Sequence, residues 1–314
     1  MSFCLPHYDI AKSHFKFTAK KLHYRKKFIL NAVKSVLSQK IPESNYELIV
    51  IKNYNDKMID SFLDKNGIKN IYSHDKSLGG KINQAIKIST GEIIAFLEDD
   101  DAFLEGKLEY VYSLFIKNQN LVYYHNQYKP VNEKYEPIVY RNNFPDFNMS
   151  CISIRKDIIE SNKIAGLTDS LDTFMYLSAV ESGKRILADK QKLTIYMVHN
   201  SASNNFSPDI NDFNASRLEY INKVIETYNT FTGFFTTKNA QKYLEAQITY
   251  YGILRFIYNH QYITVNIINF LIYSKNGFRN KAKHILIYLF LRLSKRRYRK
   301  YIQNRIYKES LRII

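Results

Sequence analysis

The sequence has few cysteines, fewer acidic than basic residues, and no tryptophan. Its two cysteines, Cys4 and Cys151, stand next to apolar residues, which excludes a disulfide framework and predicts buried free thiols in a reducing compartment. The N-terminal segment has no apolar run typical of a signal peptide, because His7, Asp9 and Lys12 interrupt it. We therefore expect the chain to stay in the cytoplasm.

Long apolar runs are also absent. The run from 285 to 291 is much shorter than the roughly 20 residues that a membrane-spanning helix needs. The longer segment 248–273 has Arg255, Asn259, His260 and Gln261 near its middle, where charge is costly in lipid. The sequence therefore predicts no membrane span.

Acidic residues are outnumbered by basic ones, 29 to 46, which gives a formal net charge of +17. Such a charge attracts the protein to phosphates, in nucleotides, nucleic acids or anionic membranes. The basic residues are concentrated near 12–27 and 292–312, and no nucleic-acid recognition motif accompanies them. The C-terminal concentration predicts a basic amphipathic helix that lies on the inner face of the cell membrane, and we expect no nucleic-acid partner.

Strand-like and helix-like segments alternate through the first 100 residues. The expected strands are 2–5, 46–51, 69–74 and 92–97, and the expected helices are 28–39, 58–67 and 81–90. Farther on we expect helices at 107–119 and 172–184 and strands at 121–129, 149–155 and 192–200. This alternation predicts an α/β fold with a mostly parallel sheet, flanked by helices.

A loop rich in serine and asparagine, "NSASNNFSPD", separates this region from a C-terminal part that is helical from 212 onward. We therefore expect two regions: a catalytic domain over 1–203 and a helical C-terminal region over 204–314.

The densest acidic cluster of this basic chain, Glu98 to Asp101, directly follows the apolar segment "IIAFL". In a parallel α/β sheet, ligands bind beyond the carboxyl ends of the strands. The cluster would repel itself unless a cation lay in it, and carboxylate oxygens suit Mg²⁺ or Mn²⁺. The residues alone also allow a solvated loop that caps the next helix.

The segment "LGGKINQAIKISTGEIIAFLEDDDAF" resembles the most characteristic part of family 2 glycosyltransferases, which have the GT-A nucleotide-diphospho-sugar transferase fold. In that family a helix with an asparagine, a Gly-Glu pair and an apolar strand lead into an acidic metal motif. Asn83, Gly91, Glu92 and the acidic cluster occupy the matching places. The resemblance extends over roughly residues 2–203, from "SFCLPHYD" at the N-terminus to the serine-rich loop.

The resemblance implies roles for the acidic residues and for the first strand. It implies that Asp100 binds the divalent metal and that Glu98 and Asp99 contact the ribose and phosphates. For Asp101 the residues themselves suggest a cap of the following helix. It places six further residues at the nucleotide-sugar: Pro6, His7, Tyr8, Asn53, Lys81 and Asn83. Lys81 is otherwise an ordinary solvated lysine at a helix start.

The resemblance also implies a general base and a second metal ligand. Asp172 matches the aspartate that deprotonates the acceptor hydroxyl, with Asp169 in reserve, although an aspartate at that place also serves as a helix N-cap. His199 matches a histidine near the metal, although a histidine at a strand end is commonly structural. The chain departs from the family after its second strand, where Lys52 and Asn53 replace an acidic pair that reads the base.

These observations predict a metal-dependent, inverting glycosyltransferase that moves a sugar from a nucleotide-diphosphate donor to a hydroxyl of a glycan or lipid-linked acceptor. Synthesis of a polysaccharide or glycoprotein fits such an enzyme. Two alternatives stay open. A nucleotidyltransferase on a similar fold would need a glycine-rich loop after the first strand, and "PHYDIAKSHF" has no glycine. A basic nucleic-acid-binding protein would spread its charge over one face of the chain.

Overall fold

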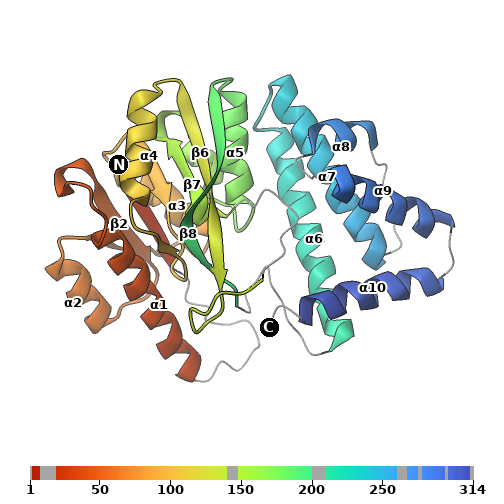
Figure 1. The fold of residues 1–314 in the computed structure, drawn as a ribbon, viewed down its shortest axis with the longest axis horizontal. Helices are drawn as coiled ribbons and strands as arrows, with labels where there is room; N and C mark the ends of the chain where they lie inside the picture. Colours follow the sequence, from red (N-terminus) through yellow and green to blue (C-terminus); the bar gives the residue numbers. More distant parts are fainter. Residues whose placement is uncertain are drawn as a thin grey trace. The chain divides into compact units, whose positions relative to one another are not determined.

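A computed structural model of the protein describes residues 2–7, 19–139, 148–199, 209–259, 267–274, 278–293 and 296–311. The chain divides into two compact units (Figure 1). One consists of Met1–Val131 and Phe147–Met197, and the other of Asn132–Asp146 and Val198–Ile314. The expected domain boundary between 203 and 204 lies outside the described residues.

The first unit is built on one eight-stranded sheet, in the order β3-β2-β1-β4-β7-β6-β8-β5. Its strands are β1 (Ser2–His7), β2 (Glu47–Lys52), β3 (Lys69–Tyr72), β4 (Ile93–Phe96), β5 (Ala102–Phe103), β6 (Leu121–Val131), β7 (Ile152–Arg155) and β8 (Arg185–Met197). β3, β2, β1 and β4 are parallel, as the alternation of strands and helices predicts. β7 runs antiparallel to both β4 and β6, so the second half of the sheet is mixed.

Five helices cover this sheet: α1 (Ala19–Leu37), α2 (Lys57–Lys65), α3 (Leu78–Ile88), α4 (Lys107–Lys117) and α5 (Leu171–Glu181). Leu48 and Val50 of β2 share a buried cluster with α1, α2 and the start of α4. Alternate residues of a strand point to opposite faces, so Ile49 and Ile51 face the other side, where α3 contacts β1 and β2. Because both faces are covered, the central strands are apolar throughout.

The structure contains a short strand, β5, that was not expected, and α1 begins at Ala19 rather than at 28. Two of the expected strands also have different bounds. β8 begins at Arg185 rather than at 192, and its first residues are half-buried or exposed. The apolar stretch in that part is only three residues long, Ile186 to Ala188, and Asp189, Lys190 and Gln191 separate it from the longer apolar run that predicts a strand. Met149–Cys151 forms a 3₁₀ turn, and only Ile152–Arg155 pairs as a strand. Cys151 is a buried free thiol, as expected.

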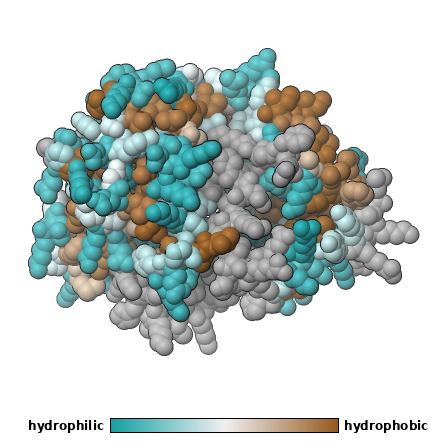
Figure 2. All heavy atoms as spheres, in the orientation of Figure 1, coloured by the Kyte–Doolittle hydropathy of each residue, from teal (hydrophilic) through white to brown (hydrophobic). Residues whose placement is uncertain are grey.

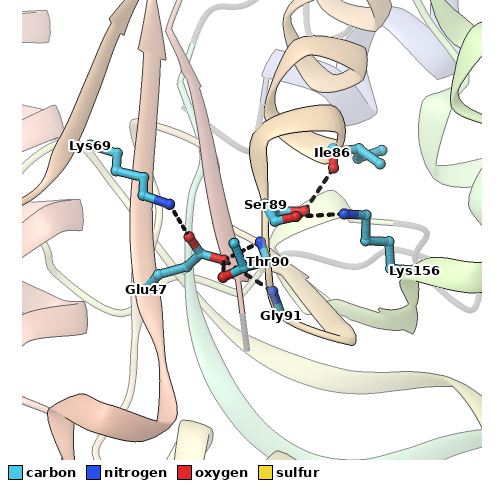
Figure 3. Close-up of polar contacts among 7 residues, drawn as sticks. All are labelled: Glu47, Lys69, Ile86, Ser89, Thr90, Gly91 and Lys156. Atoms are coloured by element: carbon cyan, nitrogen blue, oxygen red, sulfur yellow. Dashed lines mark hydrogen bonds and ion pairs between the residues drawn. The ribbon is translucent and has the colours of Figure 1, made fainter.

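Glu47, the first residue of β2, connects three segments of the first unit (Figure 3). One carboxylate oxygen accepts hydrogen bonds from the Thr90 backbone N–H at 2.6 Å, the Thr90 hydroxyl at 2.8 Å and the Gly91 N–H at 3.0 Å. The other oxygen forms an ion pair with Lys69 of β3 at 2.6 Å. Glu47 therefore ties the turn between α3 and β4 to β2 and β3.

We expect Glu47→Ala to lower the free energy of unfolding by about 1–2 kcal/mol, because Thr90 and Gly91 lose an ionised acceptor. The matched control is Glu92→Ala. The Glu92 side chain is 88% exposed and its ion pair with Arg155 is long, at 3.7 Å. Its removal should therefore change stability by less than about 0.5 kcal/mol. Urea unfolding of both variants measures the difference, and equal losses would contradict the role of Glu47.

The described part of the second unit is helical beyond 209, as the sequence predicts. It contains α6 (Ile210–Thr232), α7 (Lys238–Asn259), α8 (Ile267–Tyr273), α9 (Phe278–Leu293) and α10 (Arg296–Leu311). One buried cluster joins α7 to the last three helices through Phe256, Phe270, Tyr288 and Ile302. None of the helices within the described ranges is long and apolar enough to cross a membrane.

Candidate active site

The acidic turn, Glu98–Asp101, lies where several strands of the first unit end. β1, β2 and β4 are parallel, so their last residues, His7, Lys52 and Phe96, lie at one edge of the sheet. β6 runs antiparallel to β7, which runs antiparallel to β4, so β6 and its parallel partner β8 point to the same edge. This is the edge at which open α/β sheets bind ligands.

Hydrogen bonds to the chain around Ser150 fix the backbone of the acidic turn. The Glu98 N–H donates to the Ser150 hydroxyl at 2.8 Å. The Asp101 N–H donates to the Glu98 carbonyl at 3.2 Å, which closes the turn. Asp99 and Asp100, between them, are partly exposed. The turn therefore has a fixed frame, and its two central carboxylates are accessible to a ligand.

Asp101 anchors the turn to the end of β8. Its side chain is 2% exposed and accepts hydrogen bonds from the Met197 N–H at 3.0 Å and from the Asn148 amide at 3.4 Å. α4 begins only at Lys107, after Gly106 in a left-handed conformation, so the expectation that Asp101 caps this helix is wrong. Burial raises the pKa of Asp101 to about 7 and the nearby Asp100 adds to it, while its hydrogen bonds oppose the rise.

Lys107 lies fully buried behind the turn. Its ammonium group donates to the Ser150 carbonyl at 2.5 Å and to the Thr194 hydroxyl at 2.9 Å. It also lies 3.9 Å from the centroid of the Phe103 ring. Burial lowers the pKa of Lys107 to about 7, while Asp101 acts in the opposite direction. No sequence pattern singles out Lys107, Ser150 or Thr194, because a lysine at a helix start is usually solvated.

The fold brings Asp172 into electrostatic contact with the acidic turn. The pKa of Glu98 is raised well above its usual value, first by burial and then by Asp101, Asp100 and Asp172. Burial also raises the pKa of Asp172 to about 7, against the hydrogen bond that its carboxylate accepts from the Thr173 N–H. Two residues singled out for different roles, Glu98 and Asp172, thus lie close enough to interact electrostatically.

The position of Asp172 depends on a close contact between α3 and the loop before α5. The Gly79 N–H donates to the Leu167 carbonyl at 2.8 Å. A Cβ atom at Gly79 would lie 1.8 Å from the Ile164 carbonyl oxygen, and one at Gly80 would lie 1.8 Å from an Asp75 carboxylate oxygen. Gly79 therefore allows α3 to meet the segment that leads into α5 and Asp172, while Gly80 leaves room for the Asp75 side chain.

α3 carries two of the predicted nucleotide-sugar residues. Lys81 is fully buried, so the alternative of a solvated lysine at a helix start is wrong. Asn83 is buried as well, and its side-chain oxygen has no hydrogen-bond partner in the structure. A buried polar atom without a partner is costly, so Asn83 has unused capacity for a ligand. Contact of either residue with a nucleotide-sugar stays a prediction.

The residues after β2 differ in their surroundings. Lys52 is buried, and its ammonium group forms an ion pair with Asp60 at 2.7 Å and donates to the Tyr54 carbonyl at 2.8 Å. The Lys52 ammonium group therefore has its partners within the first unit. Asn53 is partly exposed at the ligand-binding edge, and its amide can both donate and accept hydrogen bonds.

Three predicted residues are placed only in part. Pro6 and His7 end β1 at the ligand-binding edge, opposite Ile51 and Lys52 of β2. Tyr8 lies outside the described residues. His199 follows the end of β8 by two residues and is assigned to the second unit, so its role as a metal ligand stays a prediction.

The chemistry of the acidic turn fits a divalent cation. Within the described ranges, no three His, Cys, Asp or Glu side chains are arranged to hold a metal ion. Mg²⁺ and Mn²⁺ sites on nucleotide enzymes commonly take only one or two carboxylates, with substrate phosphates and water completing the shell. Besides burial, repulsion by the neighbouring carboxylates raises the pKa of Glu98, and a bound cation would relieve this repulsion.

A cleft of about 410 Å³ lies at the opposite edge of the sheet, where β4 begins, and is lined by Thr90, Gly91, Glu92, Arg155, Lys156 and Asp157. Its cations have internal partners. Arg155 donates to the Leu121 and Phe115 carbonyls, and Lys156 donates to the Ser89 carbonyl. The acidic turn is therefore the better candidate for chemistry.

Comparison with solved structures defines the class of this fold. The structure of S. aureus TarS residues 1–349 in complex with UDP-GlcNAc matches with a TM-score of 0.53 at 13% identity, over 99% of this chain and 91% of that one. The same TarS segment without this ligand gives a TM-score of 0.52, over 92% of this chain and 80% of that one. At this identity the likeness concerns the fold, which is that of GT-A glycosyltransferases.

Sequence comparison gives the family. Residues 22–174 match the model for glycosyl transferase family 2. Residues 22–174, just under half of the chain, therefore correspond to a family 2 glycosyltransferase domain, and the fold is of the GT-A type. Uncharacterized glycosyltransferases of Rickettsia bellii and Rickettsia conorii are each 31% identical over 117 residues, which is 36% of this chain. The chain spans only 16% and 19% of the length of these two relatives.

Proposed function

We propose that the protein transfers a sugar from a nucleotide-diphosphate donor to a hydroxyl group, with inversion at the anomeric carbon. The observation that carries this proposal is that Asp172 lies within electrostatic range of the acidic turn, because transfer needs a base on the acceptor side near the diphosphate on the donor side. The family match favours this reaction over nucleotidyl transfer and over nucleic-acid binding.

In the proposed reaction, the Asp172 carboxylate takes the proton of the acceptor hydroxyl as its oxygen bonds to the anomeric carbon. The bond from that carbon to the diphosphate breaks, and the nucleoside diphosphate leaves with the electron pair. Asp99 and Glu98 orient the ribose and phosphates. A divalent cation, Mn²⁺ or Mg²⁺, held through Asp100 would neutralise the leaving diphosphate. Asp101 and Lys107 hold the turn in place without touching the substrate.

The donor is a nucleotide-diphospho-sugar bound over the ends of β1, β2 and β4, where Pro6, His7, Tyr8, Asn53, Lys81 and Asn83 would contact it. The complex of TarS with UDP-GlcNAc supports a donor of this class. The acceptor is a glycan or a lipid-linked glycan. The strong positive charge, +17 overall, supports a location at the cytoplasmic face of an anionic membrane, where lipid-linked acceptors are found.

A panel of nucleotide-sugars tests the donor site. We expect at least one of them to raise the melting temperature when Mn²⁺ or Mg²⁺ is present, by at least about 2–4 °C at saturating concentrations. Asp100→Ala should remove most of this shift, because the diphosphate loses its bridge to the protein. Asp157→Ala, a partly exposed acid at the opposite edge of the sheet, is the matched control and should keep the shift. A full shift in Asp100→Ala would overturn the proposed metal site.

A further inference from the structure

The outer faces of α8 and α9 are apolar, although both helices lie at the surface. In α8, Ile268 is 69% and Ile272 is 62% exposed, and Leu271 lies between them. In α9, Phe290 is 53% exposed, next to Leu286 and Leu289. In Figure 2 the brown spheres of apolar residues gather over these two helices, at the upper right. These six residues form the α8–α9 face.

The opposite sides of the same helices are already packed. Phe270 of α8 is fully buried and stacks on Tyr250 of α7. Tyr288 and Leu291 of α9 belong to the same buried cluster. The exposed residues of each helix are spaced three and four apart, so each set lies on one side. A surface helix ordinarily has a polar outer side, and an apolar one indicates a contact outside the unit.

α10 has the reverse arrangement. Its apolar residue Ile302 is buried in the cluster with α7, and Tyr307 packs edge-to-face on Phe213 of α6. Gln303 also donates to the Ile257 carbonyl of α7 at 2.9 Å. The apolar side of this basic helix is thus used within the unit, and its outer side offers charge. If the C-terminal region contacts a membrane, helices other than α10 have to supply the apolar surface.

The charge around the α8–α9 face indicates which kind of partner this face contacts. Residues 278–311 contain eleven Lys or Arg and one Glu. Lys283 and Arg292 of α9, which are both exposed, flank its apolar residues. Two copies of this chain joined through the face would bring these cations together, which opposes self-association. An anionic lipid surface supplies both the apolar interior and the negative headgroups.

We propose that the α8–α9 face inserts into the headgroup region of an anionic lipid bilayer, and that the surrounding basic residues bind the lipid phosphates. Insertion is shallow, because only one side of each helix is available. The proposal extends the membrane location given above but does not depend on the transfer reaction. It assigns the apolar part of the contact to α8 and α9 rather than to the basic C-terminal helix.

Sedimentation of the full chain with lipid vesicles tests the proposal. We expect binding to vesicles of phosphatidylcholine with phosphatidylglycerol, and much weaker binding to phosphatidylcholine alone. The double variant Ile272→Ser/Phe290→Ser should weaken binding to the anionic vesicles about tenfold or more, because each side chain loses apolar contact with lipid. Lys283→Gln/Arg292→Gln should weaken binding at low salt.

The matched control is Met58→Ser/Ile116→Ser, which removes apolar residues of the first unit that are 60% and 56% exposed. This variant should bind like the unchanged protein. Full vesicle binding by Ile272→Ser/Phe290→Ser would overturn the proposal, because binding would then depend on charge alone. A dimer in analytical ultracentrifugation that this variant abolishes, with no vesicle binding by the unchanged protein, would also overturn it. Donor-induced shifts in melting temperature, measured on the same samples, test the transferase proposal separately.

Discussion

Asp172→Asn should lower the rate of sugar transfer by about a hundredfold to ten-thousandfold, the range that a positioned general base contributes. Asparagine keeps the size of the side chain and can still accept the hydrogen bond from the Thr173 N–H, which is 2.7 Å from the carboxylate. It cannot take a proton from the acceptor hydroxyl. Donor binding should therefore persist while transfer is lost.

The pH dependence gives a second measurement on the same residue. Burial raises the pKa of Asp172 to about 7, and only its ionised form can act as a base. In the unchanged protein kcat/KM should therefore rise as the pH increases through about 7 and then level off. The residual activity of Asp172→Asn should lack this rise.

The control for Asp172 is Asp169→Asn. Asp169 lies just before α5 and accepts a hydrogen bond from the Ser170 hydroxyl at 2.9 Å. We expect this variant to keep transfer within about tenfold of the unchanged protein, because removing a nearby like charge affects Asp172 only indirectly. If Asp169→Asn lost transfer and Asp172→Asn kept it, the two assignments would have to be exchanged.

Gly79→Ala should prevent correct packing of α3 and lower the yield of folded protein sharply. A methyl group there would lie 1.8 Å from the Ile164 carbonyl oxygen, and a backbone atom cannot turn aside as a side chain does. The cost is roughly 3 kcal/mol or more, which is a large part of the stability of an ordinary domain. Circular dichroism and urea unfolding measure the loss.

Gly166→Ala is the matched control, because it lies in the same loop and an added Cβ would meet nothing within 4 Å. It should change the free energy of unfolding by less than about 1 kcal/mol. If Gly79→Ala folds after a small shift of the loop, Asp172 should be displaced, and transfer should then fall more than donor binding. Normal stability and normal transfer together would falsify the role given to this contact.

The alternation of apolar runs and helical periods in the first 100 residues predicts the parallel half of the sheet, because both faces of that half are covered by helices. The same method misses the start of β8. Its first apolar stretch, Ile186 to Ala188, is too short to predict a strand, and in the structure these residues pair with β6. The reversed direction of β7 was also hidden, since strand direction depends on the connections between elements.

The candidate site shows the same division at the level of single residues. The acidic turn is visible in the sequence because four consecutive acids after an apolar run need an explanation. No such pattern marks Lys107 and Ser150. The residues next to a lysine in the sequence do not show whether its side chain is buried or exposed. The tertiary fold also gives Asp101 its partner, Met197, which no local pattern relates to it.

The sequence by itself determined the α/β class, the family resemblance, the acidic turn and the helical C-terminal region. Each of these can be recognised from local periodicity or from consecutive residues. The tertiary structure decided what lies beside the turn. Burial, with additions from Asp101, Asp100 and Asp172, raises the pKa of Glu98, and the Lys107 ammonium group donates a hydrogen bond to the Ser150 carbonyl. It also decided which apolar residues of α8 and α9 face outward. Burial and proximity depend on packing between segments distant in the chain, so they exist only in the folded protein.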